Sequence, residues 1–346
     1  MGRILYGVMG DRGGHLSRAI AVAHELPGHE ILFVGGGRIG EVERHGFSFQ
    51  RTPMIGTEMT GGRIDLAATI TGAIRELWRY RQTIEHLKGL IDEYDPDLIV
   101  TDFEFFLPRA ARALGRPAIS LDRHHAITHC QYDRPPGHFG TRALSLGILH
   151  SMQMAADRYM VVSFAPMEPR DPIAAEVYPP VIRRDLSGFS PAEDEHAVVY
   201  LYGVTIERIR EVFGGRERRF VVYGQGREGE EGNLVFRRHS TDGFLADLAS
   251  AAYVVSHGGH NLISEALHFR KPLLAFPLGF EYEQYFNAWQ LQQTGYGALG
   301  EARQARAALD RFEVDLEGLR QRLAGYRPWS ERTVADRFDE LVRVGL

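Results

Sequence analysis

Short apolar runs alternate with helix-period segments along the first half of the chain. Segments such as Leu16–Leu26 and Leu107–Leu114 repeat their apolar residues with the spacing of one helix face. The apolar runs predict strands at Ile4–Val8, Glu30–Val34, Leu98–Thr101, Ala118–Leu121 and Tyr159–Ser163. Strands that alternate with helices in this way predict a parallel sheet with helices on its faces.

The same alternation of apolar runs and helix-period segments resumes in the second half, after a stretch without periodicity. Tyr178–Glu195 is charged, contains prolines and lacks periodicity, so it is interpreted as a domain linker. Beyond it, strands are predicted at Ala197–Tyr202, Phe220–Tyr223, Leu234–Phe236, Tyr253–Ser256 and Leu273–Phe276. Helices are predicted at Phe244–Ala251, Asn261–Phe269 and Glu283–Gln293. The chain is therefore expected to contain two similar α/β halves.

A last helix is predicted after Pro328, with Ser330 as its N-cap. Its apolar positions are Val334, Phe338, Leu341 and Val342, which share one helix face. The predicted domains are residues 1–180, residues 181–327 and this closing helix at residues 328–346.

Composition narrows the class of protein. The chain has 346 residues, enough for two domains at about 150 residues each. Its 44% apolar and 25% charged residues are typical of a globular enzyme. The net charge of −5 gives no global basic field for nucleic acid. Cys130 is the only cysteine, which excludes a disulfide framework and a cysteine zinc site and favours a cytoplasmic location.

No membrane-spanning segment is expected, because no apolar run approaches about 18 residues. The first residues show no targeting signal. Ile64–Ile91 has a helical pattern and carries Trp78 and Tyr80. A packed amphipathic helix is favoured there, and peripheral contact with the inner face of a membrane is the alternative.

The first candidate site is the glycine-rich loop from Gly7 to His15. Its glycine spacing is not G-x-G-x-x-G, and the second strand ends in Val34-Gly-Gly-Gly where a dinucleotide site needs an acidic residue. A dinucleotide site is therefore rejected. His15 stands at the start of the following helix and could act as a general base, or it could simply cap or pack.

The second candidate is Asp102, at the carboxyl end of the buried strand Leu98–Thr101. That end of a parallel strand faces the ligand crevice, so the carboxylate could orient a histidine base or cap a helix. Asp95-Pro-Asp97 resembles a metal-binding D-x-D sequence but precedes the strand. It is interpreted as a turn.

The strongest candidate is the strand-to-helix segment Tyr253–Leu267. A helix N-terminus binds anions, Gly258 and Gly259 permit close approach of a phosphate, and His257 could donate to a phosphate oxygen. Asn261 and Glu265 share one helix face, where a carboxylate suits a ribose diol. An ordinary strand–helix turn is the alternative.

Glu283 and Gln284 begin a helix after the next predicted strand. A carboxylate beside an amide offers the acceptors and donors that sugar hydroxyls require. The alternative is a common acidic first turn.

These motifs resemble the GT-B nucleotide-sugar glycosyltransferases, in the branch of UDP-glucuronosyltransferase-like and MurG-type enzymes. The signature H-x-G-x-N, a glutamate eight positions after the histidine, and an acidic residue with glutamine stand here as His257, Gly259, Asn261, Glu265, Pro277, Glu283, Gln284 and Asn287. The G-G-x-G-G-H motif of the MurG-type branch is similar to Met9–His15.

The resemblance implies an inverting, metal-independent transferase with no cofactor, which moves a sugar from a UDP-sugar or dTDP-sugar to an acceptor hydroxyl. The acceptor would be a small molecule, a glycan or a lipid. The implied fold is two Rossmann-like domains that face a central cleft, with the last helix crossing back to the first domain.

The resemblance also implies roles for individual residues. His15 would deprotonate the acceptor, with Asp102 behind it, and Glu265 would hold the ribose. Glu283 and Gln284 would bind the transferred sugar. The diphosphate and the base would contact the remaining donor-side residues, which are Gly14, Thr241, Phe244, His257, Gly258, Gly259, His260 and Asn261.

Several residues depart from the family pattern. His260 stands where the plant-type signature has tryptophan, and Asp11-Arg12 interrupt the glycine run. The acceptor half, residues 105–151, contains the unusual run Asp122-Arg-His-His. Two other functions stay open from the sequence: a non-hydrolysing UDP-sugar 2-epimerase and a non-catalytic sugar-nucleotide-binding subunit.

Overall fold

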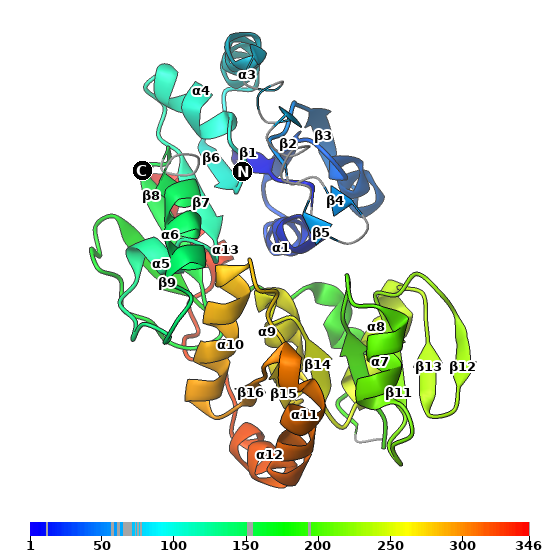
Figure 1. The fold of residues 1–346 in the computed structure, drawn as a ribbon. Helices are drawn as coiled ribbons and strands as arrows, with labels where there is room; N and C mark the ends of the chain where they lie inside the picture. Colours follow the sequence, from blue (N-terminus) through cyan, green and yellow to red (C-terminus); the bar gives the residue numbers. More distant parts are fainter. Residues whose placement is uncertain are drawn as a thin grey trace.

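The computed structural model describes residues 1–345 except 12, 57–58, 61–62, 65–70, 73, 75, 77, 151–154 and 193–194. It consists of two α/β halves, one above the other in Figure 1, each built on a seven-stranded sheet. The predicted α/β class with two sheets is therefore confirmed.

The first sheet is parallel throughout, with the strand order β3-β2-β1-β6-β7-β8-β9. Its strands are β1 (Arg3–Val8), β2 (Glu30–Gly35), β3 (Ser48–Arg51), β6 (Leu98–Asp102), β7 (Ile119–Asp122), β8 (Arg158–Val162) and β9 (Ala175–Tyr178). All five predicted strands are present. The two edge strands, β3 and β9, were not predicted, because they are short and part of their surface faces solvent.

Helices connect these strands. They are α1 (Gly13–His24), α3 (Tyr80–Tyr94), α4 (Leu107–Ala113), α5 (Ala126–His129) and α6 (Phe139–Ile148), with a 3-10 turn at Ile39–His45. The helix expected from Ile64 is wrong at its start, because β5 (Arg63–Ile64) pairs antiparallel with β4 (Met59–Thr60). Part of the remainder lies outside the described residues. Trp78 is 87% exposed.

The second sheet has the order β12-β13-β11-β10-β14-β15-β16, and only β12 runs antiparallel among its described pairings. Its strands are β10 (Ala197–Tyr200), β11 (Phe220–Tyr223), β12 (Gly229–Glu231), β13 (Leu234–Phe236), β14 (Val254–Ser256), β15 (Leu273–Ala275) and β16 (Gly297–Leu299). Its helices are α7 (Ile206–Phe213), α8 (Thr241–Ser250), α9 (His260–His268), α10 (Tyr282–Thr294), α11 (Ala305–Val314) and α12 (Leu316–Ala324).

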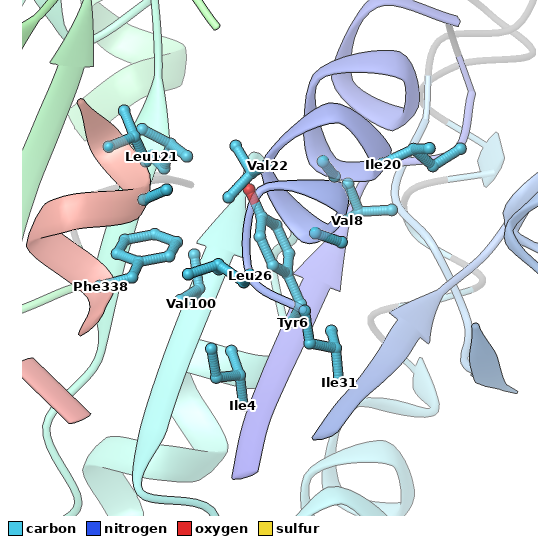
Figure 2. Close-up of a cluster of buried hydrophobic side chains, with 14 of the residues drawn as sticks. Ile4, Tyr6, Val8, Ile20, Val22, Leu26, Ile31, Val100, Leu121 and Phe338 are labelled. Carbon is cyan, nitrogen blue, oxygen red and sulfur yellow. The ribbon is translucent and has the colours of Figure 1, made fainter. Parts of the chain in front are cut away.

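The last helix, α13 (Val334–Val344), returns to the first half and completes its core. Figure 2 shows Phe338 of α13 facing the ring of Tyr6 on β1, and their ring centroids are 6.5 Å apart. The N-cap is Thr333, which forms a capping box with Asp336. The prediction of Ser330 is wrong, because its hydroxyl accepts from the Arg332 amide before the helix begins.

The segment between the two sheets contains a 3-10 turn, η3 (Arg184–Gly188). The chain leaves the first sheet at Tyr178 and enters the second at Ala197. Helix α1 follows β1 and α9 follows β14, and the two helices begin beside each other where Asn261 bonds to Gly14. The carboxyl edges of both sheets therefore meet between the halves, which is where ligands bind in open α/β sheets.

Candidate functional site

His15 and Asp102 lie together, although 87 residues separate them in the sequence. Strands β1 and β6 are neighbours, so the first turn of α1 is adjacent to the end of β6. Nδ1 of His15 is 2.7 Å from Oδ1 of Asp102, which is fully buried. If Nδ1 donates this hydrogen bond, Nε2 carries the lone pair, which is the tautomer that a general base needs.

Arg18, one turn further along α1, is a third member of this cluster, and sequence reasoning missed it. Its Nε donates to Oδ2 of Asp102 at 2.8 Å and its Nη2 donates to Oδ1 at 2.5 Å. Nη2 is also 3.1 Å from Nδ1 of His15. Burial opposes the charge of Arg18, but attraction to Asp102 outweighs it and raises the pKa of Arg18. Asp102 is thus a carboxylate shared between a histidine and a permanent cation.

Two further rings lie beside His15. Phe103 stacks on it at 5.3 Å, and His124 does so at 5.5 Å. Phe103 has a φ of 61°, which is uncommon for a residue with a side chain and is typical of functional sites. Burial lowers the pKa of His124 to about 3, with His15 adding to the shift. His124 is therefore neutral at physiological pH, and it was not singled out as a site residue from the sequence.

The glycines of the motif have different functions at the start of α9. Gly258 has a φ of 85°, and a Cβ there would lie 2.9 Å from the carbonyl oxygen of Gln284. Gly258 is therefore required for packing against α10, and its N–H donates to Ser256. Gly259 is the N-cap, and no atom lies within 4 Å of where its Cβ would be. Gly259 therefore leaves open space at the start of α9, whereas Gly258 faces the backbone of α10.

Asn261 joins the two halves. Its side-chain Nδ2 donates to the backbone carbonyl of Gly14 at 2.8 Å. His260, the first residue of α9, is buried, and burial lowers its pKa well below the usual value. Its Nε2 has no hydrogen-bond partner among the described residues. The motif helix and the His15 loop therefore form one site at the interface.

Both ring nitrogens of His257 contact the backbone. Nδ1 is 2.8 Å from the carbonyl oxygen of Phe276, and Nε2 is 2.9 Å from the carbonyl oxygen and 3.2 Å from the amide nitrogen of Tyr202. Burial lowers the pKa of His257, so the ring is neutral and both of its nitrogens are engaged with backbone groups. The expected donation from His257 to a phosphate oxygen does not fit this arrangement. The ring instead links the loops that contain Tyr202, His257 and Phe276.

The carboxylate of Glu265 forms an ion pair with Arg183 from the linker. Nε of Arg183 is 2.9 Å from Oε1, and Nη2 donates to Oε2 at 3.2 Å. Burial raises the pKa of Glu265, and the charge of Arg183 opposes this rise. The linker pattern gave no signal that Arg183 would belong to the site.

Glu283 and Gln284 lie in the first turn of α10, as expected. Oε1 of Gln284 accepts from the Leu278 amide at 3.1 Å, and its Nε2 donates to the hydroxyl of Tyr202 at 3.0 Å. Oε1 of Glu283 accepts from Asn287. Gln284 is thus held at both ends of its amide and Glu283 at one oxygen, and each keeps further hydrogen-bonding capacity.

The expected base-binding residues are placed differently. Thr241 begins α8 and is exposed. Phe244 is 3% exposed and packs on Tyr223, so little of its ring is open to a ligand. The exposed ring is His239, which stacks on Phe244 with centroids 5.4 Å apart. Its position after β13, at the carboxyl edge of the sheet, was the available signal.

Comparison with known proteins identifies the family. A model described as glycosyl transferase family 1 matches residues 2–316. The chain belongs to this family. The glycosyltransferase is 25% identical over 341 residues to an uncharacterized glycosyltransferase of Methanosarcina acetivorans, and the match covers 86% of this chain and 85% of the relative.

Solved structures share the GT-B fold of this glycosyltransferase. Arabidopsis thaliana UGT89C1, complexed with UDP, has a TM-score of 0.67 and 16% identity, with all of both chains covered. SsfS6 from Streptomyces sp. SF2575, complexed with thymidine diphosphate, has a TM-score of 0.63 and 16% identity, covering 99% of this chain and 100% of that chain.

The remaining expectations concern other parts of the glycosyltransferase. Asp95 caps α3 in the left-handed conformation and Asp97 accepts from the Arg3 amide, so the predicted turn is confirmed. Cys130 is buried, and burial raises its pKa to about 11. Within the described ranges, no group of three or more acidic, histidine or cysteine residues could hold a metal ion. No described helix is long and apolar enough to cross a bilayer. Arg12 lies outside the described residues.

Proposed function

We propose that this glycosyltransferase moves a sugar from a UDP-sugar or dTDP-sugar to an acceptor hydroxyl with inversion of the anomeric carbon. Nε2 of His15 would take the hydroxyl proton as the acceptor oxygen bonds to that carbon. The bond from the carbon to the diphosphate oxygen breaks, and its electron pair leaves with the diphosphate. The observation that carries this proposal is the 2.7 Å contact between His15 and Asp102 beside the start of α9.

The diphosphate would bind at the N-terminus of α9. Gly259 offers open space there, and the first-turn N–H groups and the helix dipole favour a negative charge. Donors that are fixed before the reaction stabilise charge as it develops on the leaving group. This helix end would take the place of a metal ion, so we expect the reaction to be insensitive to chelators.

The nucleoside would lie along the edge of the second sheet. The exposed ring of His239 would stack on the base, and Glu265, held by Arg183, would accept from the ribose hydroxyls. Similar solved structures contain UDP and thymidine diphosphate, which supports a pyrimidine nucleotide. Glu283 and Gln284 would bind the sugar hydroxyls.

A transfer assay with pools of UDP-sugars and dTDP-sugars and of hydroxylated acceptors tests the proposal. The expected product has the mass of one added sugar and the anomeric configuration opposite to that of the donor, and a His15→Asn variant forms it far more slowly. A nucleotide-sugar changed at C2 without any acceptor would support the epimerase instead. Nucleotide binding with no turnover for any pool would support a binding subunit.

A further inference from the structure

The run Asp122-Arg-His-His places one arginine between the two halves. Arg123 follows β7 of the first half, but its side chain extends to α10 of the second half. It is 1% exposed, which makes it the largest fully buried side chain in the described chain. Aromatic rings of Phe286 and Phe164 lie 5.0 Å and 5.6 Å from its guanidinium carbon. A charge buried this deeply requires specific partners.

The partners of Arg123 are mostly neutral. Nε donates to Oδ1 of Asn287 at 2.9 Å, and Nη2 donates to Oε1 of Gln290. Nη1 lies 3.4 Å from the Val162 carbonyl oxygen and 3.3 Å from the sulfur of Met167. Burial lowers the pKa of Arg123 to about 10, so the side chain remains charged at neutral pH.

Arg123 fixes the orientation of the Asn287 amide. A guanidinium has no acceptor, so the atom of Asn287 that faces it must be the oxygen. The amide nitrogen then donates to the carbonyl oxygen of Gly258 at 3.2 Å and to Oε1 of Glu283. A flipped amide would place nitrogen against the guanidinium and oxygen against two acceptors, which is repulsive at every contact.

We propose that Arg123 is a positioning residue for the donor sugar. Through the fully buried Asn287, it holds Oε1 of Glu283 and leaves Oε2 for a sugar hydroxyl. The same amide holds the Gly258 turn, next to the start of α9. Arg123 therefore acts on the sugar without touching it. This inference rests on the proposed function, because it needs a nucleotide-sugar at Glu283.

Calorimetry on the full chain tests the inference with UDP, dTDP, and their glucose and N-acetylglucosamine derivatives. The measured quantity is the sugar increment, the ratio of the Kd of the nucleotide to the Kd of its sugar derivative. For Arg123→Met, which is close in length and neutral, we expect the largest increment to fall about tenfold, as for the loss of one hydrogen bond to a charged group. The Kd of the free nucleotide should change less than about threefold, because the diphosphate would approach Gly259 and not the Gly258 carbonyl that Asn287 contacts.

Two further variants keep the result interpretable. Gln290→Leu removes a different partner of Arg123 and leaves Asn287 in place, so its increment should match the wild type. Asn287→Asp keeps an acceptor for Arg123 but places a carboxylate against Glu283, so its increment should fall even if Arg123→Met fails to fold. The inference is overturned if Arg123→Met and Asn287→Asp weaken nucleotide and nucleotide-sugar equally, or weaken neither. A wild-type protein that binds none of the probes would overturn the proposed function instead.

Discussion

Asn261 of α9 donates a 2.8 Å hydrogen bond to the carbonyl oxygen of Gly14, one residue before His15. This contact links the helix that would bind the diphosphate to the loop that would carry the base. The relative position of the two halves, and with it the distance from base to donor, depends on such contacts. Proximity of this kind contributes much of the rate in transfer reactions.

Replacing Asn261 by aspartate should weaken this link, because a carboxylate cannot donate to the Gly14 carbonyl and repels it. We expect kcat/KM to fall by about tenfold to a hundredfold, as for a lost hydrogen bond plus repulsion. Small-angle scattering should show a larger radius of gyration. Asn261→Gln keeps the donor and is the control. Unchanged kinetics and radius in the aspartate variant would contradict the contact's importance.

Removing the His15 side chain should slow turnover strongly while sparing nucleotide binding. General-base catalysis contributes roughly 10²–10⁴-fold, so His15→Ala should lose about that much in kcat. The Kd for UDP or dTDP should stay within about threefold of the wild type, because the imidazole would touch the acceptor and not the nucleotide. An equal loss of binding and turnover would show that His15 has a structural role only.

Arg18 should stabilise the fold by neutralising Asp102. Its Nε and Nη2 donate to both oxygens of that carboxylate, which is fully buried. Arg18→Met leaves the buried carboxylate without its permanent cation, so we expect the free energy of unfolding to fall by about 3–5 kcal/mol, as for breaking a buried ion pair. Urea unfolding measures this loss, and Arg18→Lys, which retains a charge, should lose less. Equal urea midpoints for the methionine variant and the wild type would contradict this account.

His239 should contribute to nucleotide affinity without contributing to folding. Its ring is exposed and stacks on Phe244. His239→Ala should weaken UDP binding by about 1–3 kcal/mol, as for the loss of one base-stacking ring. His239→Trp should restore or improve it, and Tm should change little in either variant. Wild-type affinity in the alanine variant would place the base elsewhere.

Glu104 should make stability depend on pH. Its buried carboxylate accepts from the Phe106 and Leu107 amides, and burial raises its pKa from 4.5 to about 7. Between these values the folded chain keeps a proton that the unfolded chain has lost, so the free energy of unfolding falls as pH rises. Glu104→Gln removes this titration but places its amide nitrogen against one of the two backbone donors, so its urea midpoint should lie below that of the wild type near pH 4.5 and approach it near pH 8. Parallel pH dependences of the two proteins would refute this assignment.

The sequence predicted the sheets better at their centres than at their edges. Central strands such as β1 and β14 are continuous apolar runs because both faces are covered. Edge strands such as β12 (Gly229–Glu231) and β16 (Gly297–Leu299) contain glycine or charge and are stabilised by pairing with a neighbour. Strand β16 pairs with β15, a segment distant in the chain, and such pairing leaves no local pattern. Strand β12 pairs with β13 across the turn residues Gly232 and Asn233, a local hairpin signal that was missed.

The residues of the candidate site were likewise predicted only in part. The pairing of His15 with Asp102 was expected from the family resemblance, and the neighbouring strands β1 and β6 bring the two residues together. Arg18 and Arg183 were missed because a single arginine on a helix or in a linker usually faces solvent. Their ion pairs with Asp102 and Glu265 exist only through tertiary contacts between segments far apart in the chain.

Thermal stability measured with UDP, GDP, dTDP, ADP and NAD, each with and without EDTA, tests the central claim most directly. A ligand at one hundred times its Kd stabilises the folded state by about 2.7 kcal/mol, which is a measurable rise in Tm. The account predicts a selective rise with UDP or dTDP that is the same with EDTA. A rise with NAD alone, or with none of the five nucleotides, would contradict it.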